Sequence, residues 1–403
     1  MNTGGFVIIV ADDALYPVIG YSTEDLFVVP VLLSNFSFWM EQRKNEIIAN
    51  RLQNVHATSE ISAQWTALLN NQPFASRSTG AVLPLLQTTW TQHAPYNSLC
   101  PGGSVTGCVA TTMSQIMRYW KYPSKGTGSS SYSSTYGTLS ANYANTTYNW
   151  NNMPDNVTSV NNDVSTIMYQ CGISVEMIYS PSTSASAVTI DDNPACCAQI
   201  SFPEYFGYDS ATIKDLIRSD YSDANWISLI ESDLNAGQPL MYEAHDSTRG
   251  GHVWVCDGYN STNMLHMNWG WGGQYNGYYS VNSLTSNAFN FSYKHKVLAG
   301  IKPKNVTGIP SISSDASFYI YPNPASTQLN IHIPSSGTGT STLSIINVLG
   351  QEVLSNSLSL GSVPINSGEG RGEAIDISQL PAGMYFLQMK TESAIDTKRF
   401  IKE

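Results

Sequence analysis

A cysteine directly after a glycine, at the head of a helical pattern, is the residue best suited to chemistry in this chain. Cys108 follows Gly107, and it precedes apolar residues spaced for one face of a helix: Val109, Met113, Ile116, Met117 and Trp120. We therefore expect Cys108 in the first turn of an amphipathic helix, where the helix dipole favours a thiolate. Gly107 would let a substrate backbone approach the sulfur closely. A cysteine packed at the start of a core helix is the alternative interpretation.

A thiol nucleophile needs an imidazole to take its proton and a third group to orient that imidazole. The segment GGHVWVCDGYNSTNMLHMNWGWGG, residues 250–273, has the pattern of two strands joined by a turn. Folded symmetrically about Asn260, this hairpin places His252 opposite Asn268, with β-carbons about 4.5 to 5.5 Å apart. The Asn268 side-chain oxygen could then hold the imidazole N–H. Trp269, next in sequence, could shield that hydrogen bond from water.

Other interpretations of these residues stay open. The chain has seven histidines, and spacing alone does not exclude His93 or His245 as the base, or the weaker candidate His56. Trp269 and Trp271 could both be packing residues of the core.

The elements that must position these residues follow from periodicity. Apolar stretches between turn residues predict a small β-meander over 5–33, and a helix follows from about Phe36. The run NNQPFASRSTG at 70–80 lacks periodicity and predicts an exposed, cleavable connector. Between 104 and 300 helices come first and strands later, which predicts an α+β domain. Within it we expect helices near 160–171 and 224–236 and strands over 238–301.

A second, all-β domain is predicted at the C-terminal end. It follows the polar linker IKPKNVTGIPSISS and starts at about Ala316, with about seven short alternating strands typical of a β-sandwich. The expected division of the chain is 1–76, 77–303, a linker at 304–315, and 316–403.

Composition excludes several classes of function. The net charge of −11 and the absence of any Lys/Arg run leave no basic surface for nucleic acid. The longest apolar runs, FVIIV and LFVVPVLL, are far shorter than the roughly 20 residues of a membrane helix. No charged segment followed by an apolar core and a cleavage site opens the chain, so we expect a sequence without its signal peptide.

The six cysteines do not form a zinc motif, because no CxxC pair or Cys/His quartet is present. They are also too sparse for a disulfide scaffold. A bridge between Cys100 and Cys108, or between Cys171 and Cys196, stays open for an oxidising compartment. The adjacent Cys196 and Cys197 have no assigned role.

Three segments closely resemble the signature segments of the streptopain family of papain-like cysteine peptidases, to which interpain and periodontain belong. They are GCVATTMSQIMRYWKYP, GGHVWVCDGY and MNWGWGG, in the family's order and at similar separations. The resemblance covers roughly residues 5–303 and extends to WTQHAPYN, YNWNNMP, CGISVEMIYSPSTSAS, YFGY and GQPLMY. It implies a papain-like α+β peptidase domain.

The resemblance also implies roles for individual residues. Cys108 would be the nucleophile, His252 the general base and acid, and Asn268 the residue that orients the imidazole. Trp269 would be the aromatic shield. The side chain of Gln92, with the backbone N–H of Cys108, would form the oxyanion hole, where fixed donors contribute several kcal/mol.

Both ends of the chain carry resemblances of their own. Residues 5–75 resemble the back half of the family's propeptide, with GFVIIVADDALYPVIGYS as its hairpin and FWMEQRKNEI as its helix; the front half is missing. The segments YPNPA, INVLGQEV, LPAGMYFLQ and KRFIKE, in order at 316–403, resemble the C-terminal sorting domain of type IX secretion cargo in Bacteroidetes. A generic β-sandwich adhesion module is the alternative for this domain.

The function expected from the sequence is a secreted or cell-surface cysteine endopeptidase made as a self-processing zymogen. Protein or peptide substrates and the type IX machinery are its expected partners, no cofactor or metal is implied, and the oligomeric state is left open. The preference of the resembled family for an apolar residue before the cleaved one implies a hydrophobic subsite, which Met177, Ile178 and Val255 could line. An inactive papain-like binding protein and a thiol acyltransferase are the alternative functions.

Overall fold

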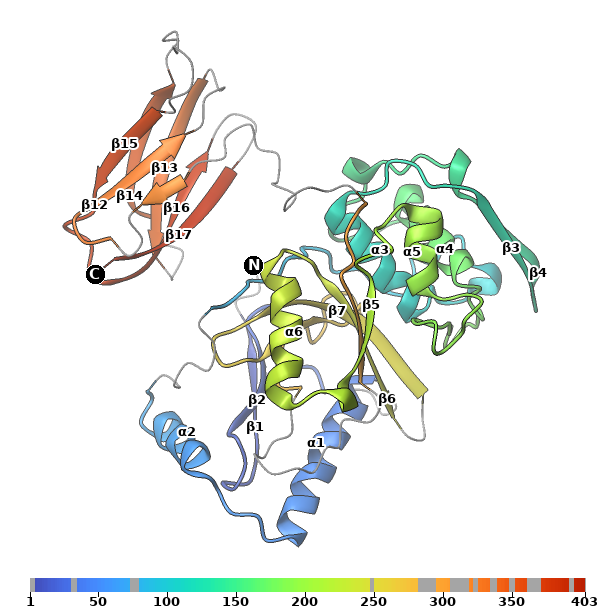
Figure 1. Cartoon of the computed structure of the whole chain (residues 1–403), viewed down its shortest axis with the longest axis horizontal. Helices are drawn as coiled ribbons and strands as arrows, with labels where there is room; N and C mark the ends of the chain where they lie inside the picture. The colour runs from blue at the N-terminus through green and yellow to red at the C-terminus, as the bar shows by residue number, and fades with distance from the viewer. Residues whose placement is uncertain are drawn as a thin grey trace. The chain divides into compact units, whose positions relative to one another are not determined.

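The computed structural model divides the chain into two compact units, Met1–Thr307 and Gly308–Glu403 (Figure 1). In the first unit it describes residues 4–29, 35–72, 80–246, 250–281 and 295–304. In the second it describes residues 319–321, 325–333, 339–347, 352–360, 371–390 and 395–402.

The first unit is built on an eight-stranded antiparallel sheet, with strands in the order β1-β2-β9-β8-β7-β6-β10-β5. The two strands at one edge come from the N-terminal segment, because β2 pairs with β9 through Gly20–Tyr279 and Tyr21–Tyr278. The strands are β1 Phe6–Ile9, β2 Val18–Ser22, β5 Lys214–Ile217, β6 Leu240–Asp246, β7 Gly250–Tyr259, β8 Leu265–Asn268, β9 Gly277–Tyr279 and β10 Lys296–Ala299.

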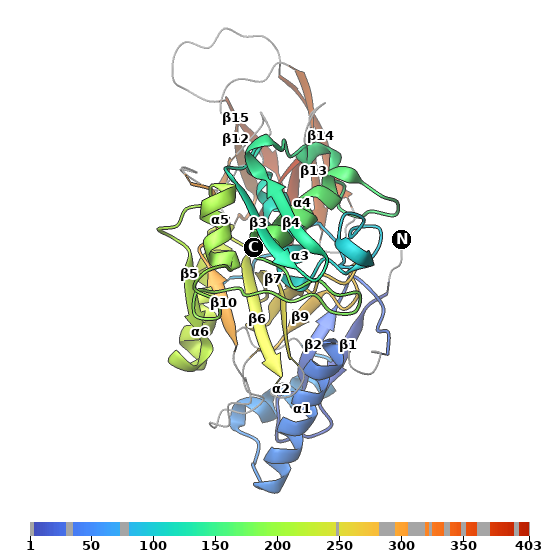
Figure 2. The ribbon, with the colours of Figure 1, turned by 90° about the vertical axis from the view of Figure 1, so that its right-hand side faces the viewer.

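Alternation along the strands gives the sheet two apolar faces. Val253 and Val255 face a cluster that also contains the buried residues of α3 and α4, whereas Trp254 and Cys256 face a second cluster with α6 and Phe36 of α1. Figures 1 and 2 show the sheet between these helical layers, with α1 and α2 beside the N-terminal strands. The helices are α1 Asn35–Leu52, α2 Ser59–Leu69, α3 Cys108–Trp120, α4 Asn162–Ser174, α5 Ala198–Phe206 and α6 Asp223–Asn235.

Local sequence explains where the helices begin. The side chains of Thr58, Asn161 and Ser222 accept hydrogen bonds from the first turns of α2, α4 and α6. Helix α3 begins instead after Gly107, and its residues from Val109 to Met117 are all buried. The predicted apolar stripe of this helix is therefore part of an almost completely enclosed helix.

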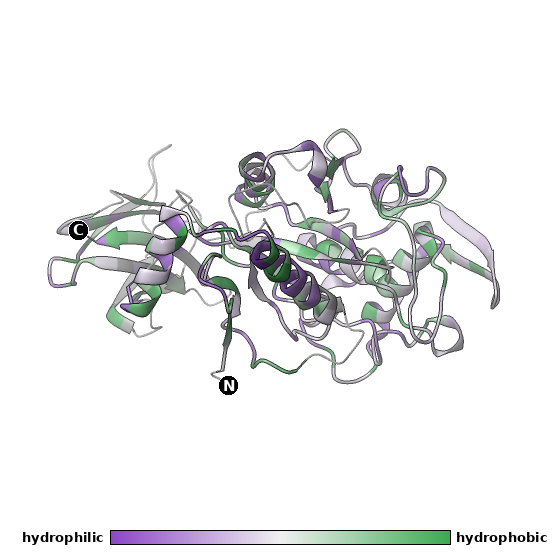
Figure 3. Cartoon of the chain, turned by 90° about the horizontal axis from the view of Figure 1, so that it is seen from below, coloured by the Kyte–Doolittle hydropathy of each residue, from purple (hydrophilic) through white to green (hydrophobic). Residues whose placement is uncertain are grey.

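One hairpin of the first unit was not predicted. It consists of β3 Ser129–Ser134 and β4 Gly137–Asn142, in a serine-rich stretch with little hydrophobic colouring (Figure 3). Its Tyr132 hydroxyl donates a hydrogen bond to the Met177 carbonyl at 2.6 Å, and its Tyr136 hydroxyl lies 3.2 Å from the Ser104 hydroxyl. The hairpin therefore packs against the chain that leads into α3.

The second unit consists of seven strands among its described residues. A three-stranded sheet, β11-β12-β15, and a four-stranded sheet, β14-β13-β16-β17, share one apolar core that includes Leu329, Ile375, Leu343 and Phe400. The strands are β11 Tyr319–Tyr321, β12 Gln328–Ile333, β13 Gly339–Asn347, β14 Glu352–Leu360, β15 Arg371–Asp376, β16 Gly383–Lys390 and β17 Ile395–Lys402.

Of the predicted β-meander over 5–33, the described residues form only the two-stranded hairpin of β1 and β2. The helix after it and the helices near 160–171 and 224–236 are confirmed as elements. The predicted connector lies outside the described residues over 73–79, as does the linker over 305–315. Among the described residues no helix is both long and apolar enough to cross a membrane.

Candidate active site

Cys108 is the first residue of α3, and its surroundings depend on Gly107. Gly107 has a φ of 86°, a conformation that favours glycine, and a β-carbon there would lie 2.7 Å from the Met177 side chain. The thiol is part-buried, and burial raises its pKa to about 11. Backbone contacts with Val253 and with the first turn of α3 oppose this rise, whereas the charge of Glu243 adds to it. The thiol is therefore neutral at neutral pH in this arrangement.

A hydrogen bond fixes α3 to the strand that carries His252. The Thr112 hydroxyl, one turn after Cys108, donates to the carbonyl of Val253 at 3.2 Å. Since Cys108 also interacts with the Val253 backbone, the thiol lies beside the residue that follows His252 in β7.

His252 lies within a group of indole rings. Its imidazole is stacked 4.8 Å from Trp271 and 5.8 Å from Trp254, measured between ring centroids. Its Nε2 lies 3.0 Å from the carbonyl oxygen of Trp269, to which it donates as the neutral tautomer. Burial lowers the pKa of His252 to about 4. In this arrangement the proton on Nε2 is held by a backbone carbonyl.

The predicted pairing of His252 with Asn268 is wrong. The β7–β8 ladder pairs Asn268 with Val255, and β8 ends there, so no β8 residue lies opposite His252. The turn is wider than expected, because Asn260 closes a loop with Met264 through hydrogen bonds of 3.0 Å. A bulge between Cys256 and Gly258 then changes the register by one residue, which leaves Asn268 opposite Val255.

Asn268 is buried and held by hydrogen bonds that do not include His252. Its amide nitrogen donates to the Thr88 carbonyl at 2.7 Å, and its side-chain oxygen accepts from Gln115 at 3.3 Å and from Gly270 N–H at 3.2 Å. The Gln115 oxygen in turn accepts from the Thr88 hydroxyl at 2.9 Å and from Trp90 N–H at 3.3 Å. Thr88, Gln115 and Asn268 therefore form a closed network.

Gln115 was missed by the sequence reasoning. It lies on α3 two turns after Cys108 and is 0% exposed. A polar residue close to the apolar stripe of a helix was the only signal that could have found it. It joins the helix of Cys108, the segment leading to Gln92 and the end of β8.

The backbone around Gln92 contacts both the loop that leads into α3 and the segment after β8 that carries Trp271. Its carbonyl accepts from Thr106 N–H at 3.0 Å, two residues before Cys108. The preceding Thr91 forms a β-bridge with Trp271. The backbone of Gln92 is therefore fixed next to the loop that leads into α3, and its side chain is half-buried.

Trp269 is buried, stacks on Trp271 at a centroid distance of 5.3 Å, and packs at a tilt of 39° against Trp254 at 4.7 Å. Its indole N–H donates to the Tyr275 carbonyl at 3.0 Å. Phe36 of α1 contacts its ring edge at 6.1 Å and stacks on Tyr275 at 4.2 Å. The N-terminal segment therefore packs directly on the residue that binds His252.

The residues expected to line a hydrophobic subsite are not equivalent. Met177 lies against Gly107 but is itself fully buried, whereas Ile178 is 73% exposed. Val255 is 0% exposed in the core beneath the sheet, because it faces α3 along the alternation of β7. Val255 therefore has no exposed surface that a substrate could contact.

His93 and His245, the other candidates for the catalytic base, differ in exposure and in their partners. His93 is exposed. His245 on β6 is half-buried, and its Nε2 lies 2.5 Å from the Glu243 carboxylate. His245 is opposite Gly251 and one residue from the strand partner of His252.

None of the six cysteines is in a disulfide. The Cys171 thiol contacts the Met117 sulfur at 3.6 Å, and the Cys196 thiol donates to the Ser174 carbonyl at 3.3 Å. The described residues hold no cluster of three or more His, Cys, Asp or Glu side chains arranged for a metal ion.

Three families match parts of the chain. Residues 90–279 match the peptidase C10 family, residues 319–403 the secretion system C-terminal sorting domain, and residues 1–47 the Spi protease inhibitor family.

Individual proteins are similar over most of the first unit. Streptopain of Streptococcus pyogenes is 30% identical over 326 residues, which cover 75% of this chain and 79% of streptopain. The thiol protease/hemagglutinin PrtT of Porphyromonas gingivalis is 28% identical over 79% of this chain and 38% of its own length. A prointerpain A fragment of Prevotella intermedia has a similar structure, with a TM-score of 0.59, 30% identity, and coverage of 75% of this chain and 93% of the fragment.

Proposed function

The chain belongs to the peptidase C10 family of streptopain-like cysteine peptidases, and we propose that it cleaves proteins through Cys108, His252 and Asn268. The observation that carries this assignment is the hydrogen bond from the Thr112 hydroxyl, one turn after Cys108, to the carbonyl of Val253, the residue next to His252. Loss of casein hydrolysis on replacement of Cys108 is the test of the proposal.

In the proposed reaction, His252 takes the proton of the Cys108 thiol, and the thiolate attacks the peptide carbonyl carbon. The C–N bond then breaks as His252 returns the proton to the leaving amine. Water, deprotonated by His252, hydrolyses the remaining thioester. The oxyanion formed at each step would be stabilised by the backbone N–H of Cys108 and the side chain of Gln92.

The described arrangement is an inactive one on this account. The His252 Nε2 proton is held by the Trp269 carbonyl, and the high thiol pKa and low imidazole pKa both oppose an ion pair. For catalysis the imidazole of His252 would have to leave the Trp269 carbonyl and its stacked position on Trp271 and rotate toward Cys108. Rotation would place the ring between the thiol and Asn268, with Trp269 as the shield.

We expect Gln115→Leu to lower kcat/KM by about tenfold. The Asn268 oxygen loses one of its donors, and the buried Thr88 hydroxyl and Trp90 N–H lose the Gln115 oxygen as their acceptor. The loss should fall on kcat rather than KM, and Gln115→Glu should restore part of it only at acid pH, where the carboxyl can donate. Ser114→Ala, on the same helix with a hydroxyl bonded to the Ala110 carbonyl, is the control. Unchanged or higher activity of Gln115→Leu would remove Gln115 from the site.

We infer that the N-terminal segment is an inhibitory propeptide, and two of its contacts support this role. Its β2 extends the sheet of the peptidase domain, and its Phe36 packs on Trp269, whose carbonyl binds His252. Its match to the Spi protease inhibitor family supports the same role. We take residues 1–76 as this propeptide and 77–303 as the peptidase domain.

We expect the purified wild-type chain to shorten itself on standing to a form that starts between Phe74 and Gly80. Cys108→Ala should stay at full length under the same conditions, because the enzyme itself makes the cut. N-terminal sequencing of both proteins over time measures this. Equal maturation of Cys108→Ala in pure solution, or a fully active wild type that keeps residues 1–73, would contradict the zymogen proposal.

The C-terminal sorting domain marks the protein for type IX secretion, so it is secreted or held at the cell surface. Its two sheets with one shared core support an immunoglobulin-like sandwich over 316–403, joined by a linker at 304–315. Within the peptidase domain, Gly107 and Ile178 are the residues we propose beside the substrate, and Met177 is buried behind Gly107.

A further inference from the structure

A buried histidine joins the N-terminal segment to the peptidase domain. His266 of β8 is 2% exposed, and both of its ring nitrogens face carboxylates. Nδ1 lies 2.6 Å from Asp257 of β7, and Nε2 lies 2.6 Å from Glu24, which follows β2 in the N-terminal segment. The second Asp257 oxygen accepts from Leu86 N–H at 2.9 Å. His266 thus connects Asp257 of the peptidase domain with Glu24 of the N-terminal segment.

This geometry requires a proton. A neutral imidazole has one N–H donor, so it can satisfy one carboxylate while its other nitrogen would present a lone pair to the second. Two contacts of 2.6 Å to ionised carboxylates are both favourable only when both ring nitrogens carry hydrogen. The bridge therefore consists of an imidazolium between two carboxylates.

We propose that His266 and Asp257 form a binding site on the peptidase domain for a carboxylate carried by the propeptide, and that this site holds Glu24 only while His266 is protonated. The proposal rests on the assignment of residues 1–76 as a propeptide. When the propeptide leaves, His266 can lose its Nε2 proton and keep the hydrogen bond to Asp257. Docking of the propeptide therefore takes up one proton from solvent, and release of the propeptide returns that proton.

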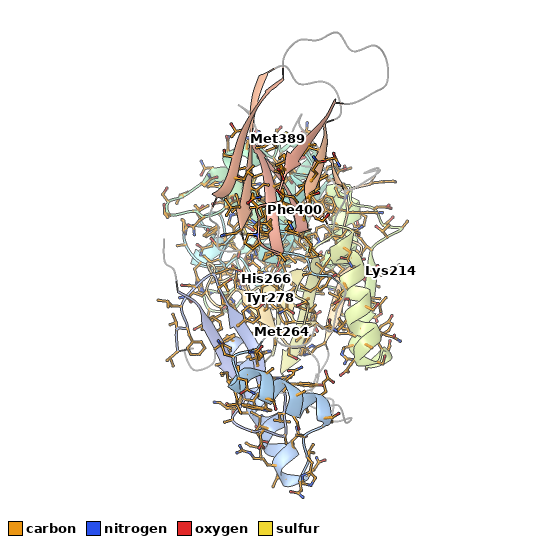
Figure 4. All side chains as sticks on the ribbon, turned by 90° about the vertical axis from the view of Figure 1, so that its left-hand side faces the viewer. Lys214, Met264, His266, Tyr278, Met389 and Phe400 are labelled. Carbon is orange, nitrogen blue, oxygen red and sulfur yellow. The ribbon has the colours of Figure 1, made fainter. Side chains whose placement is uncertain are left out.

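Aromatic side chains next to the bridge align the N-terminal segment with the peptidase domain. Tyr21 of β2 stacks on Tyr278 of β9 at 5.1 Å, and Tyr278 contacts the His266 ring edge-on at 5.0 Å. Figure 4 shows His266 and Tyr278 next to each other where the N-terminal strands meet the sheet. The Tyr21 hydroxyl accepts a hydrogen bond of 3.0 Å from Asn260. The site thus takes a particular ligand: an antiparallel strand with a carboxylate three residues after an aromatic residue.

The groups that face His266 set the pH dependence. Burial opposes its charge, but Asp257 and Glu24 outweigh burial and raise the pKa of His266 to about 9. Burial also raises the pKa values of Tyr278 and Tyr21, so both phenols stay neutral over the same range. A histidine whose pKa rises on docking stabilises the docked state below its free pKa, and this stabilisation is lost as pH rises through about 9.

Hydrogen exchange of the full-length Cys108→Ala chain tests the proposal without any need for catalysis. Peptides that cover 18–29 report the opening of β2, and rates are compared between Glu24→Gln and its parent at each pH. We expect about tenfold faster exchange in Glu24→Gln at pH 7, because one charged hydrogen bond at a part-exposed carboxylate is lost. The ratio should fall toward one at pH 10, where the parent has lost the proton.

Glu41→Gln is the matched control, since Glu41 lies on α1 and pairs with Lys44 on the surface; its ratio should stay near one at every pH. A ratio near one for Glu24→Gln at pH 7, or an equal ratio at pH 7 and pH 10, overturns the proposal. The ¹³C resonance of the His266 ring, followed against pH, gives a second readout. The pKa of the His266 imidazole should fall by at least one unit in Glu24→Gln. If the wild-type chain does not mature but these results hold, the zymogen proposal fails and the carboxylate site remains.

Discussion

Replacing Cys108 with alanine is expected to lower kcat for casein hydrolysis by three orders of magnitude or more, to the background rate. The thiolate forms the bond that breaks the peptide, and groups that act as a unit with a nucleophile cannot replace it. The fold should survive, because Cys108 is the part-buried first residue of α3, whereas the enclosed part of the helix starts at Val109. Activity is measured on protein from which the N-terminal segment has been removed.

Cys196→Ala is the matched control, because Cys196 is also part-buried and its thiol bonds a backbone carbonyl. It should keep wild-type activity. Substantial cleavage by purified Cys108→Ala would place the nucleophile elsewhere in the chain.

Replacing His252 with alanine is expected to lower kcat by about a thousandfold, because general base and acid catalysis by one side chain contributes roughly 10² to 10⁴. His245→Ala should stay within about fivefold of wild type. The two histidines lie on neighbouring strands, and His245 is already paired with Glu243. Rates on a peptide substrate, measured from pH 5 to 9, separate the two variants.

A reversed result, with active His252→Ala and inactive His245→Ala, would make the His245–Glu243 pair the base. Asn268→Ala should be milder than His252→Ala, because orienting an imidazole contributes less than the proton transfer itself. Circular dichroism of each variant establishes that the fold is intact before the rates are compared.

Local patterns predicted the elements that carry the candidate site. The helical spacing after Gly107 placed Cys108 at the start of α3, and alternation around GYNST predicted the strands of His252 and Asn268. These features depend on neighbouring residues alone. The family resemblance then supplied roles that spacing could not.

Contacts between distant segments were not predictable in this way. The register of β7 and β8 depends on the Asn260 side chain and a bulge, and an error of three residues was enough to pair the wrong partners. Gln115 has a role only because Thr88 and Asn268 meet it in space. The Glu24–His266 contact joins residues 242 positions apart, and no sequence pattern marks either one.

The central claim is that Cys108 is the nucleophile activated by His252, and labelling of the matured wild-type protein with a thiol-directed epoxide tests it most directly. Mass spectrometry locates and counts the label while residual activity is measured. We expect activity to fall in proportion to one label per chain on Cys108, and labelling of His252→Ala to be at least a hundredfold slower. Complete loss of activity with Cys108 unmodified, or in proportion to a label on another cysteine, would contradict the account.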